Sequence, residues 1–167
     1  MKIKKVIIWF TGIPGTGKTV LSSKFYAYLK RKNKKIKLID GDKFRKKIKN
    51  FKYDLLNREK VGEKKIRMAN KYYDKGYIVL VSGIAHKKKL RNDLRKFAGE
   101  RNYEEIYLKS SINVCLKRKK QLNDYNKIFK NKYQDHKNYN LKINTEKELK
   151  SSFNKLKNYI LHKHEIR

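Results

Sequence analysis

The chain has 167 residues, with 47 Lys and Arg against 15 Asp and Glu, which gives a formal net charge of +32. This length suits one domain with its own hydrophobic core. The single cysteine, Cys115, excludes an internal disulfide and a cysteine-rich zinc site. We therefore expect one domain over residues 1–167 in a reducing compartment, the cytoplasm.

The positive charge favours phosphate-rich partners, either nucleic acid or small anions. The lysines, however, are spread along the whole chain rather than gathered in one arm. We expect most of them to form a solvated surface, and a nucleic-acid partner stays open as the alternative. The apolar run at 6–10 is too short for a signal peptide, and no stretch approaches the ~20 apolar residues of a membrane span, so no membrane partner is expected.

Short apolar runs alternate with longer amphipathic ones along the chain. The runs rich in β-branched or aromatic residues predict strands at 6–10, 36–39, 77–81, 105–108 and 141–143. Helices are predicted between them at 18–32, 44–51, 58–75, 88–97, 112–119 and 146–161. The alternation indicates an α/β three-layer sandwich, with a mostly parallel five-stranded sheet and helices on both faces.

Two local features refine these elements. Thr145 is followed three residues later by Glu148, which predicts a capping box at the start of the last helix. The polar segment 120–140 carries Tyr125, Phe129 and Tyr133 among lysines and asparagines. We interpret this segment as a lid over the site, and a surface insertion is an equally good interpretation.

One octet matches the phosphate-binding pattern G-x-x-x-x-G-K-[ST]: Gly12-Ile13-Pro14-Gly15-Thr16-Gly17-Lys18-Thr19. Its glycines let successive N–H groups turn toward the phosphates of ATP, and a helix is predicted to begin at Lys18. Lys18 is expected to reach the β- and γ-phosphates, and the Thr19 hydroxyl to bind Mg²⁺. A mere tight turn is the alternative, but a predicted strand precedes the octet and a helix follows it, as in a P-loop fold.

Two carboxylates, Asp40 and Asp42, follow the second predicted strand. Ligands in open α/β sheets bind at this end of the strands, so the pair suggests metal coordination and deprotonation of an acceptor hydroxyl. The alternative is that one of them caps the following helix, and Asp42 could do both.

The run Trp9-Phe10-Thr11-Gly12 before the octet, and Ile39-Asp40-Gly41-Asp42-Lys43-Phe44-Arg45 after it, resemble the adenylylsulfate kinase family. The resemblance continues more weakly through Arg58, Ala69, Gly76, Val114-Cys115 with Arg118, and 141–145. It implies a P-loop kinase that uses ATP and Mg²⁺ and phosphorylates the 3′-hydroxyl of a nucleotide such as adenosine 5′-phosphosulfate. Members of this family are often homodimers.

The resemblance also implies residue roles. Asp42 is expected to act as base or metal partner, and Arg45 and Arg58 to grip the phosphosulfate of the acceptor, with Asp40 and Ile84 beside it. Arg118 is expected to stabilise the transferring group or to stack on adenine.

The acceptor half departs from the family pattern. Val61 stands where the family has an asparagine, Gly83-Ile84-Ala85-His86 replaces phenylalanine-isoleucine-serine-proline, and the family's lid motifs are absent. These departures leave open another nucleotide conjugate as acceptor, such as a cytidine diphosphate phosphoramidate, and a non-catalytic relative, against which the intact Lys18, Thr19 and Asp42 argue. The net charge of +32 keeps a nucleic-acid-binding NTPase or polynucleotide kinase as a further alternative. His86 could contact substrate, although a lone loop histidine is more often a surface residue, and we expect Cys115 and Trp9 to be core residues.

Overall fold

The computed structural model describes residues 5–32, 34–52, 54–99, 101–118 and 137–166. Five strands form one sheet in the order β2-β3-β1-β4-β5: β1 (Ile7–Thr11), β2 (Ile36–Ile39), β3 (Ile78–Ser82), β4 (Tyr103–Lys109) and β5 (Leu141–Asn144). All four neighbouring pairs of strands are parallel. The predicted α/β sandwich is confirmed, and its sheet is parallel throughout the described residues.

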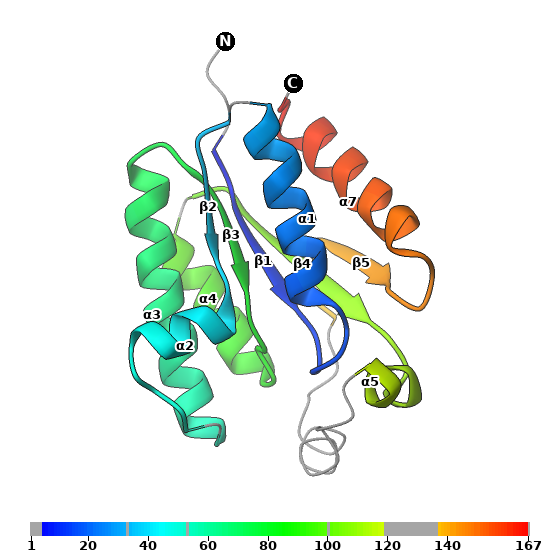
Figure 1. Cartoon of the computed structure of the whole chain (residues 1–167). Helices are drawn as coiled ribbons and strands as arrows, with labels where there is room; N and C mark the ends of the chain where they lie inside the picture. Colours follow the sequence, from blue (N-terminus) through cyan, green and yellow to red (C-terminus); the bar gives the residue numbers. More distant parts are fainter. Residues whose placement is uncertain (1–4, 33, 53, 100, 119–136, 167) are drawn as a thin grey trace.

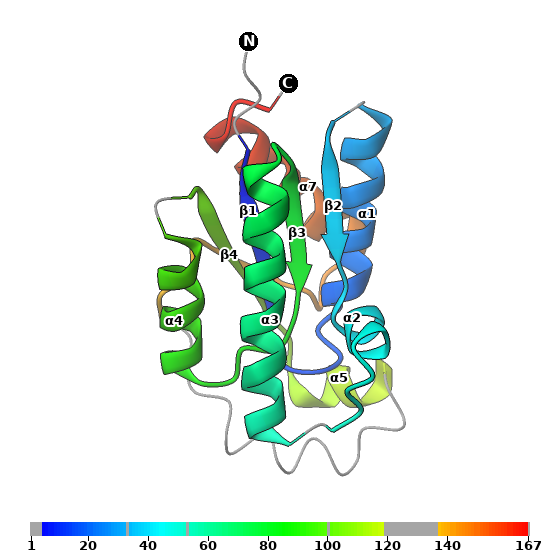
Figure 2. The same ribbon diagram turned by 90° about the vertical axis from the view of Figure 1, so that its left-hand side faces the viewer.

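Helices cover both faces of the sheet. On one face α1 (Lys18–Arg31) packs against α7 (Leu149–Lys163), as Figure 1 shows. On the other face α3 (Leu55–Asp74) packs against α4 (Lys88–Ala98), which lie over the sheet in Figure 2. Two short helices, α2 (Gly41–Lys47) and α5 (Ile112–Arg118), lie at the end of the sheet to which the strands point.

The central strand β1 is buried on both of its faces, which explains why residues 7–10 are all apolar. Ile8 and Phe10 enter the core cluster under α1 and α7, whereas Ile7 and Trp9 enter the cluster under α3 and α4. Every residue of the strand is buried, because a parallel central strand has both faces covered. The expectation that Trp9 is a core residue is confirmed.

The capping box at Thr145 is a wrong prediction. The last helix begins at Leu149, and Glu148 is its N-cap residue without a side-chain cap hydrogen bond. The Thr145 hydroxyl instead donates to the carbonyl oxygen of Lys109, at 3.3 Å, and so joins the loop after β5 to the end of β4. The Thr145 hydroxyl therefore makes a tertiary hydrogen bond in place of the helix-capping hydrogen bond that the local sequence pattern predicts.

The predicted lid at 120–140 falls almost entirely outside the described residues, so it stays a prediction. Of the helices that the structure describes, none combines the length and the apolar character needed to cross a bilayer.

Candidate active site

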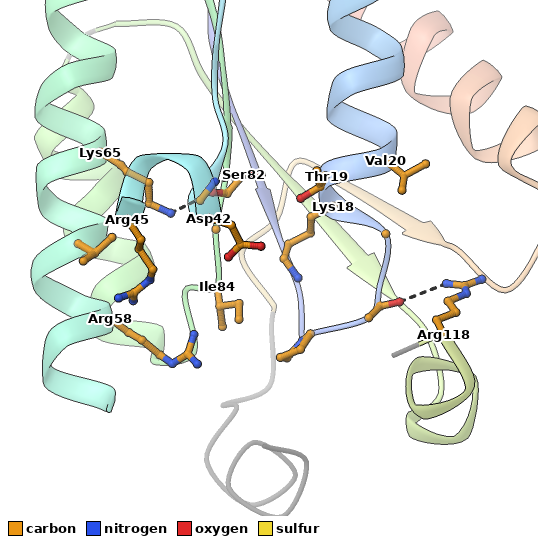
Figure 3. A pocket seen from close by; sticks show the side chains of 16 residues that line it. Lys18, Thr19, Val20, Asp42, Arg45, Arg58, Lys65, Ser82, Ile84 and Arg118 are labelled. Atoms are coloured by element: carbon orange, nitrogen blue, oxygen red, sulfur yellow. Dashed lines mark hydrogen bonds between the residues drawn. The ribbon is translucent and has the colours of Figure 1, made fainter. Parts of the chain in front are cut away.

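The carboxyl ends of the strands open into a cavity of about 350 Å³. One wall is the loop between β1 and α1 with the first turn of α1, contributing Pro14, Gly15, Gly17, Lys18, Thr19 and Val20. The opposite wall comes from α2, α3 and the segment after β3, and contributes Gly41, Asp42, Arg45, Arg58, Val61, Lys65, Ser82, Gly83 and Ile84. Figure 3 shows the two walls facing each other, with Arg118 beside the loop.

The phosphate-binding loop depends on its first glycine. Gly12 has φ +146°, a conformation that side chains rarely adopt, and a Cβ atom there would overlap the Leu108 carbonyl oxygen of β4. The buried Thr16 hydroxyl donates to the carbonyl oxygen of Ile13, at 2.9 Å, and fixes the turn from inside. Gly12 and Thr16 therefore shape the loop from behind, while the residues between and after them line the cavity.

The Lys18 ammonium group is held inside this loop. Its Nζ donates to the carbonyl oxygens of Gly12, at 2.9 Å, and Ile13, at 2.7 Å. A phosphate bound by the N–H groups of the loop and the N-terminus of α1 would lie beside this charge. The position suits the role that the sequence predicts for Lys18.

Asp40 joins three elements at the floor of the site. Its Oδ1 accepts from the N–H groups of Asp42 and Lys43, each at 3.1 Å, which caps α2. Its Oδ2 accepts from the hydroxyls of Thr19, at 3.0 Å, and Ser82, at 3.2 Å. Burial alone would raise the pKa of Asp40, but these hydrogen bonds outweigh it and the pKa is lowered.

The structure assigns the helix cap to Asp40. Asp40 is the helix cap and does not line the cavity, so α2 begins at Gly41 rather than at the predicted residue 44. Asp42 is exposed on the first turn of α2, and Figure 3 shows its carboxylate projecting into the cavity toward Lys18. A role of Asp40 in substrate binding stays a prediction, and its two oxygens already accept four hydrogen bonds.

Two arginines line the wall opposite the loop. Arg45 on α2 and Arg58 on α3 are buried, with 6% and 8% of their surface exposed. The Nη1 of Arg45 donates to the Lys52 carbonyl oxygen, at 2.8 Å, and to Asn50 Oδ1, at 3.3 Å, which fixes the side chain against the α2–α3 connection. Ile84, after β3, adds an apolar side chain to the same wall, on the side of the arginines that faces the loop (Figure 3).

Arg118 connects the loop to a second cavity. Its guanidinium donates to the carbonyl oxygens of Gly15, at 3.4 Å, and Thr145, at 2.5 Å. The adjoining cavity measures about 230 Å³ and is lined partly by Val20 and Leu149, which are 53% and 42% exposed. An apolar cleft beside the phosphate loop with one planar cation at its edge is suited to a nucleobase.

The predictions for His86 and Cys115 have different outcomes. Cys115 is fully buried behind the loop, as expected. His86 is also fully buried, so the expectation of a surface residue is wrong. Its Nε2 lies 3.7 Å from Oε1 of Glu59 on α3, and burial is the main cause that lowers its pKa. The close packing of α3 and α4 around the loop after β3 encloses a side chain that the local sequence could not place.

Comparison with known families then decides the lineage, because residues 4–135 match the family described as adenylylsulphate kinase. The chain belongs to the adenylylsulphate kinase family. The match includes the phosphate-binding loop, both carboxylates and the two buried arginines, so the resemblance seen in the sequence motifs is confirmed.

Individual relatives in this family have different printed activities. A cytidine diphosphoramidate kinase of Campylobacter jejuni is 32% identical over 71% of this chain and 68% of its own length. An adenylyl-sulfate kinase of Prochlorococcus marinus is 33% identical over 67% of this chain and 56% of its own length. The chain thus spans little more than half the length of some of the relatives that it matches.

A solved structure agrees with the fold. The APS kinase CysC of Mycobacterium tuberculosis, in complex with AMPPNP and APS, superposes with a TM-score of 0.84. The superposition covers 94% of this chain and 98% of the other, at 19% identity. At this identity the likeness shows the P-loop kinase fold alone.

Two polar residues of the cavity were not predicted from the sequence, and neither was the apolar Val20. Lys65 on α3 and Ser82 at the end of β3 both line the cavity, although neither lies in a recognised motif. The available signal was the spacing from Arg58 to Lys65 on a predicted helix, where residues seven apart share a face.

Proposed function

We propose that this member of the adenylylsulphate kinase family transfers the γ-phosphoryl group of ATP to a hydroxyl of a nucleotide-type acceptor. The observation that carries the proposal is the cavity with two unlike walls. Lys18 and the phosphate-binding loop form one wall, while Arg45 and Arg58 form the other. A donor phosphate and an anionic acceptor would thus bind from opposite sides and meet between them.

Each wall has a separate task in this reaction. Lys18 and the loop would hold the β- and γ-phosphates of ATP, with the base in the cleft beside Arg118. Arg45 and Arg58 would bind the anionic part of the acceptor with their planar guanidinium groups. Asp42, on the same wall as the two arginines and directed toward Lys18, would orient the acceptor hydroxyl for in-line attack and accept its proton.

A Mg²⁺ ion fits the oxygen donors that are present. The Thr19 hydroxyl and the Asp42 carboxylate are the hard ligands that Mg²⁺ prefers. Within the described residues no group of three or more His, Cys, Asp and Glu could hold a metal. This agrees with the usual binding of Mg²⁺ by one or two protein groups together with phosphates and water. When bound, the ion would neutralise charge on the phosphates.

The leading acceptor is adenosine 5′-phosphosulfate, because the sequence motifs and the family point to it. A cytidine diphosphate phosphoramidate is the second candidate, and the 32% identical Campylobacter kinase with that printed name favours it. Val61, which is apolar and 2% exposed in the acceptor wall, is compatible with an acceptor other than the phosphosulfate.

The test is a coupled assay of ADP release with ATP and Mg²⁺. The acceptors are adenosine 5′-phosphosulfate, a cytidine diphosphate phosphoramidate and an oligonucleotide with a 5′-hydroxyl. We expect turnover with one of the two nucleotide conjugates, and a loss of about 100-fold or more in kcat for Lys18→Ala and for Asp42→Ala.

Matched controls are Lys24→Ala on the exposed side of α1 and Asp93→Ala on α4, both expected to keep wild-type rates. Turnover with the oligonucleotide alone would move the proposal to a polynucleotide kinase. Absence of ADP release with every acceptor, in a protein that binds AMPPNP, would contradict the proposal.

A further inference from the structure

Lys65 is a buried cation in the cavity wall that is formed by α2, α3 and the segment after β3. It has 4% of its surface exposed, yet it lines the cavity. Its Nζ donates to the Ser82 carbonyl oxygen, at 2.9 Å, and lies 5.0 Å from the centre of the Trp9 ring. An ammonium group has three N–H donors, and within the described residues Lys65 Nζ donates one hydrogen bond, to Ser82, beside its contact with the Trp9 ring. A donor therefore remains for a ligand in the cavity.

The surrounding backbone leaves room for this side chain. A Cβ atom on Gly83 would overlap Lys65 Nζ, so the ammonium group occupies the place where another residue would have a side chain. A Cβ atom on Gly41 would lie 3.6 Å from the same nitrogen. Two glycines from different elements thus border the nitrogen, and Figure 3 shows it directed from α3 toward Ser82 at the cavity wall.

The charges that face Lys65 leave this part of the cavity positive. Arg45 and Asp42 face it from α2, Asp40 from the start of that helix, and Arg58 from α3. Burial is the largest cause that lowers its pKa, the nearby Arg45 lowers it further, and the net value is about 7. The carboxylates of Asp40 and Asp42 only partly offset these effects, so an added anion would stabilise the charged form of Lys65.

We propose that Lys65 is an acceptor-binding residue, which donates to an anionic group of the acceptor beside Arg45 and Arg58 and so helps to select acceptors with a phosphate-type anion. This inference rests on the proposed function, because it assumes that the acceptor enters from this wall. A single side chain, Lys65, would thus favour acceptors that carry a negative charge.

A purely structural role explains the geometry less well. One hydrogen bond to Ser82 would not require a lysine here, since apolar groups that fill the same space are often as stable as a buried charge. An anion-binding role explains both the burial and the position in the cavity wall. On this basis, removing the charge would weaken binding of the acceptor without weakening binding of ATP.

The first test is equilibrium binding by titration calorimetry to protein saturated with Mg²⁺ and AMPPNP, which occupies the ATP side. The probes are adenosine 5′-phosphosulfate and cytidine 5′-diphosphate. We expect Lys65→Met to bind the better probe about 10- to 100-fold more weakly than wild type, the range for a hydrogen bond to a charged group. Its affinity for AMPPNP should be unchanged, which also shows that the variant is folded.

The matched control is Lys64→Met, one residue earlier on the exposed side of α3 and expected to match wild type. A second readout is the dependence of phosphosulfate affinity on pH between about pH 6 and pH 8.5. Wild-type affinity should fall as pH rises through this range, because Lys65 loses its proton, and the fall should be smaller in Lys65→Met.

Equal affinity of wild type and Lys65→Met for the probe would overturn the inference, and so would absence of binding of both probes to wild type. The two proposals fail separately. Binding that depends on Lys65 without any ADP release would retain this inference and contradict the kinase function. Normal turnover by Lys65→Met with an unchanged KM for the acceptor would retain the kinase and remove the role of Lys65.

Discussion

Asp40 and Asp42 show how two residues of the same type, two positions apart, take different tasks. Asp40 accepts four hydrogen bonds and joins the phosphate-binding loop, α2 and the end of β3. Asp42 faces the cavity from an exposed position. The first carboxylate builds the site, and in our proposal only the second takes part in the reaction.

The network of Asp40 predicts a stability effect. Asp40→Ala removes the helix cap and leaves the hydroxyls of Thr19 and Ser82 without their acceptor, so we expect a loss of about 2–4 kcal/mol in the free energy of unfolding. Asp54→Ala, which removes the cap of α3 at an exposed position, is the matched control and should lose clearly less. Urea denaturation measures both, and equal losses would show that the hydroxyl contacts contribute little.

Arg118 predicts an effect on ATP binding. Its guanidinium joins the Gly15 and Thr145 carbonyl oxygens and borders the second cavity. We expect Arg118→Ala to raise the KM for ATP about 10-fold, since a charged hydrogen-bonding group is lost, with a smaller change in the acceptor KM. Lys117→Ala, at the neighbouring exposed position, should behave as wild type. A rise confined to the acceptor KM would place Arg118 on the other substrate.

At the scale of elements, the last helix is anchored by one carboxylate. Glu104 of β4 contacts three side chains of the last turns of α7 and of the residue after it. Its Oε1 lies 2.9 Å from Lys163 Nζ and 2.9 Å from His164 Nε2, and its Oε2 accepts from the Tyr159 hydroxyl at 2.8 Å. Burial raises the pKa of Glu104, but these three partners outweigh it and the net shift is downward.

This anchor predicts a pH dependence of stability. Because the folded-state pKa of Glu104 lies below its ordinary value of 4.5, its contribution is present above about pH 4.5 and is lost as pH falls through the folded pKa. We expect Glu104→Gln to lose about 1–3 kcal/mol of unfolding free energy at pH 7, and the difference from wild type to shrink toward pH 3.

Chemical denaturation at several pH values measures this difference. Glu63→Gln, a partly exposed carboxylate on α3, is the control and should show no such convergence. A loss in Glu104→Gln that stays constant with pH would show that the contribution of Glu104 does not depend on its charge, and equal stability of the two proteins would show that packing alone holds the helix.

At the scale of the whole molecule, the net charge of +32 is accommodated partly by aromatic rings. Lysine ammonium groups lie over tyrosine rings at several separate places: Lys32 over Tyr28, Lys35 over Tyr77, and Lys37 over Tyr72, at 5.6, 4.7 and 4.9 Å from the ring centres. The positive charges thus lie against the electron-rich faces of the rings, which attract a cation. Charge distributed in this way favours weak attraction to any polyanion over one defined nucleic-acid site.

This distribution predicts steep salt dependence. We expect a fluorescein-labelled single-stranded oligonucleotide to bind about 10- to 100-fold more weakly at about 200 mM salt than at about 50 mM. Fluorescence anisotropy measures the affinity, and saturating AMPPNP with Mg²⁺ should leave it unchanged, because the contacts lie outside the cavity. Tight binding at physiological salt that AMPPNP displaces would instead favour a polynucleotide acceptor.

Much of the fold and half of the site could be predicted from local pattern. The G-x-x-x-x-G-K-[ST] spacing places Lys18 and Thr19 at a helix start by chain geometry alone, and the predicted strands match the observed ones within two residues at each end. These features depend on neighbours in sequence, and for this reason the sequence by itself determined them. The family motifs likewise named Asp42, Arg45 and Arg58, and the structure brings all three to one cavity.

Tertiary contacts decided the rest. The Thr145 hydroxyl donates to the Lys109 carbonyl oxygen instead of capping the last helix. His86 is buried between α3 and α4. Asp40 accepts hydrogen bonds from the hydroxyls of Thr19 and Ser82. Lys65 became part of the cavity because the end of β3 and the Trp9 ring lie against its face of α3. Each of these outcomes depends on a partner more than 15 residues away in the chain, and local propensity carries no information about such a partner until the sheet has assembled.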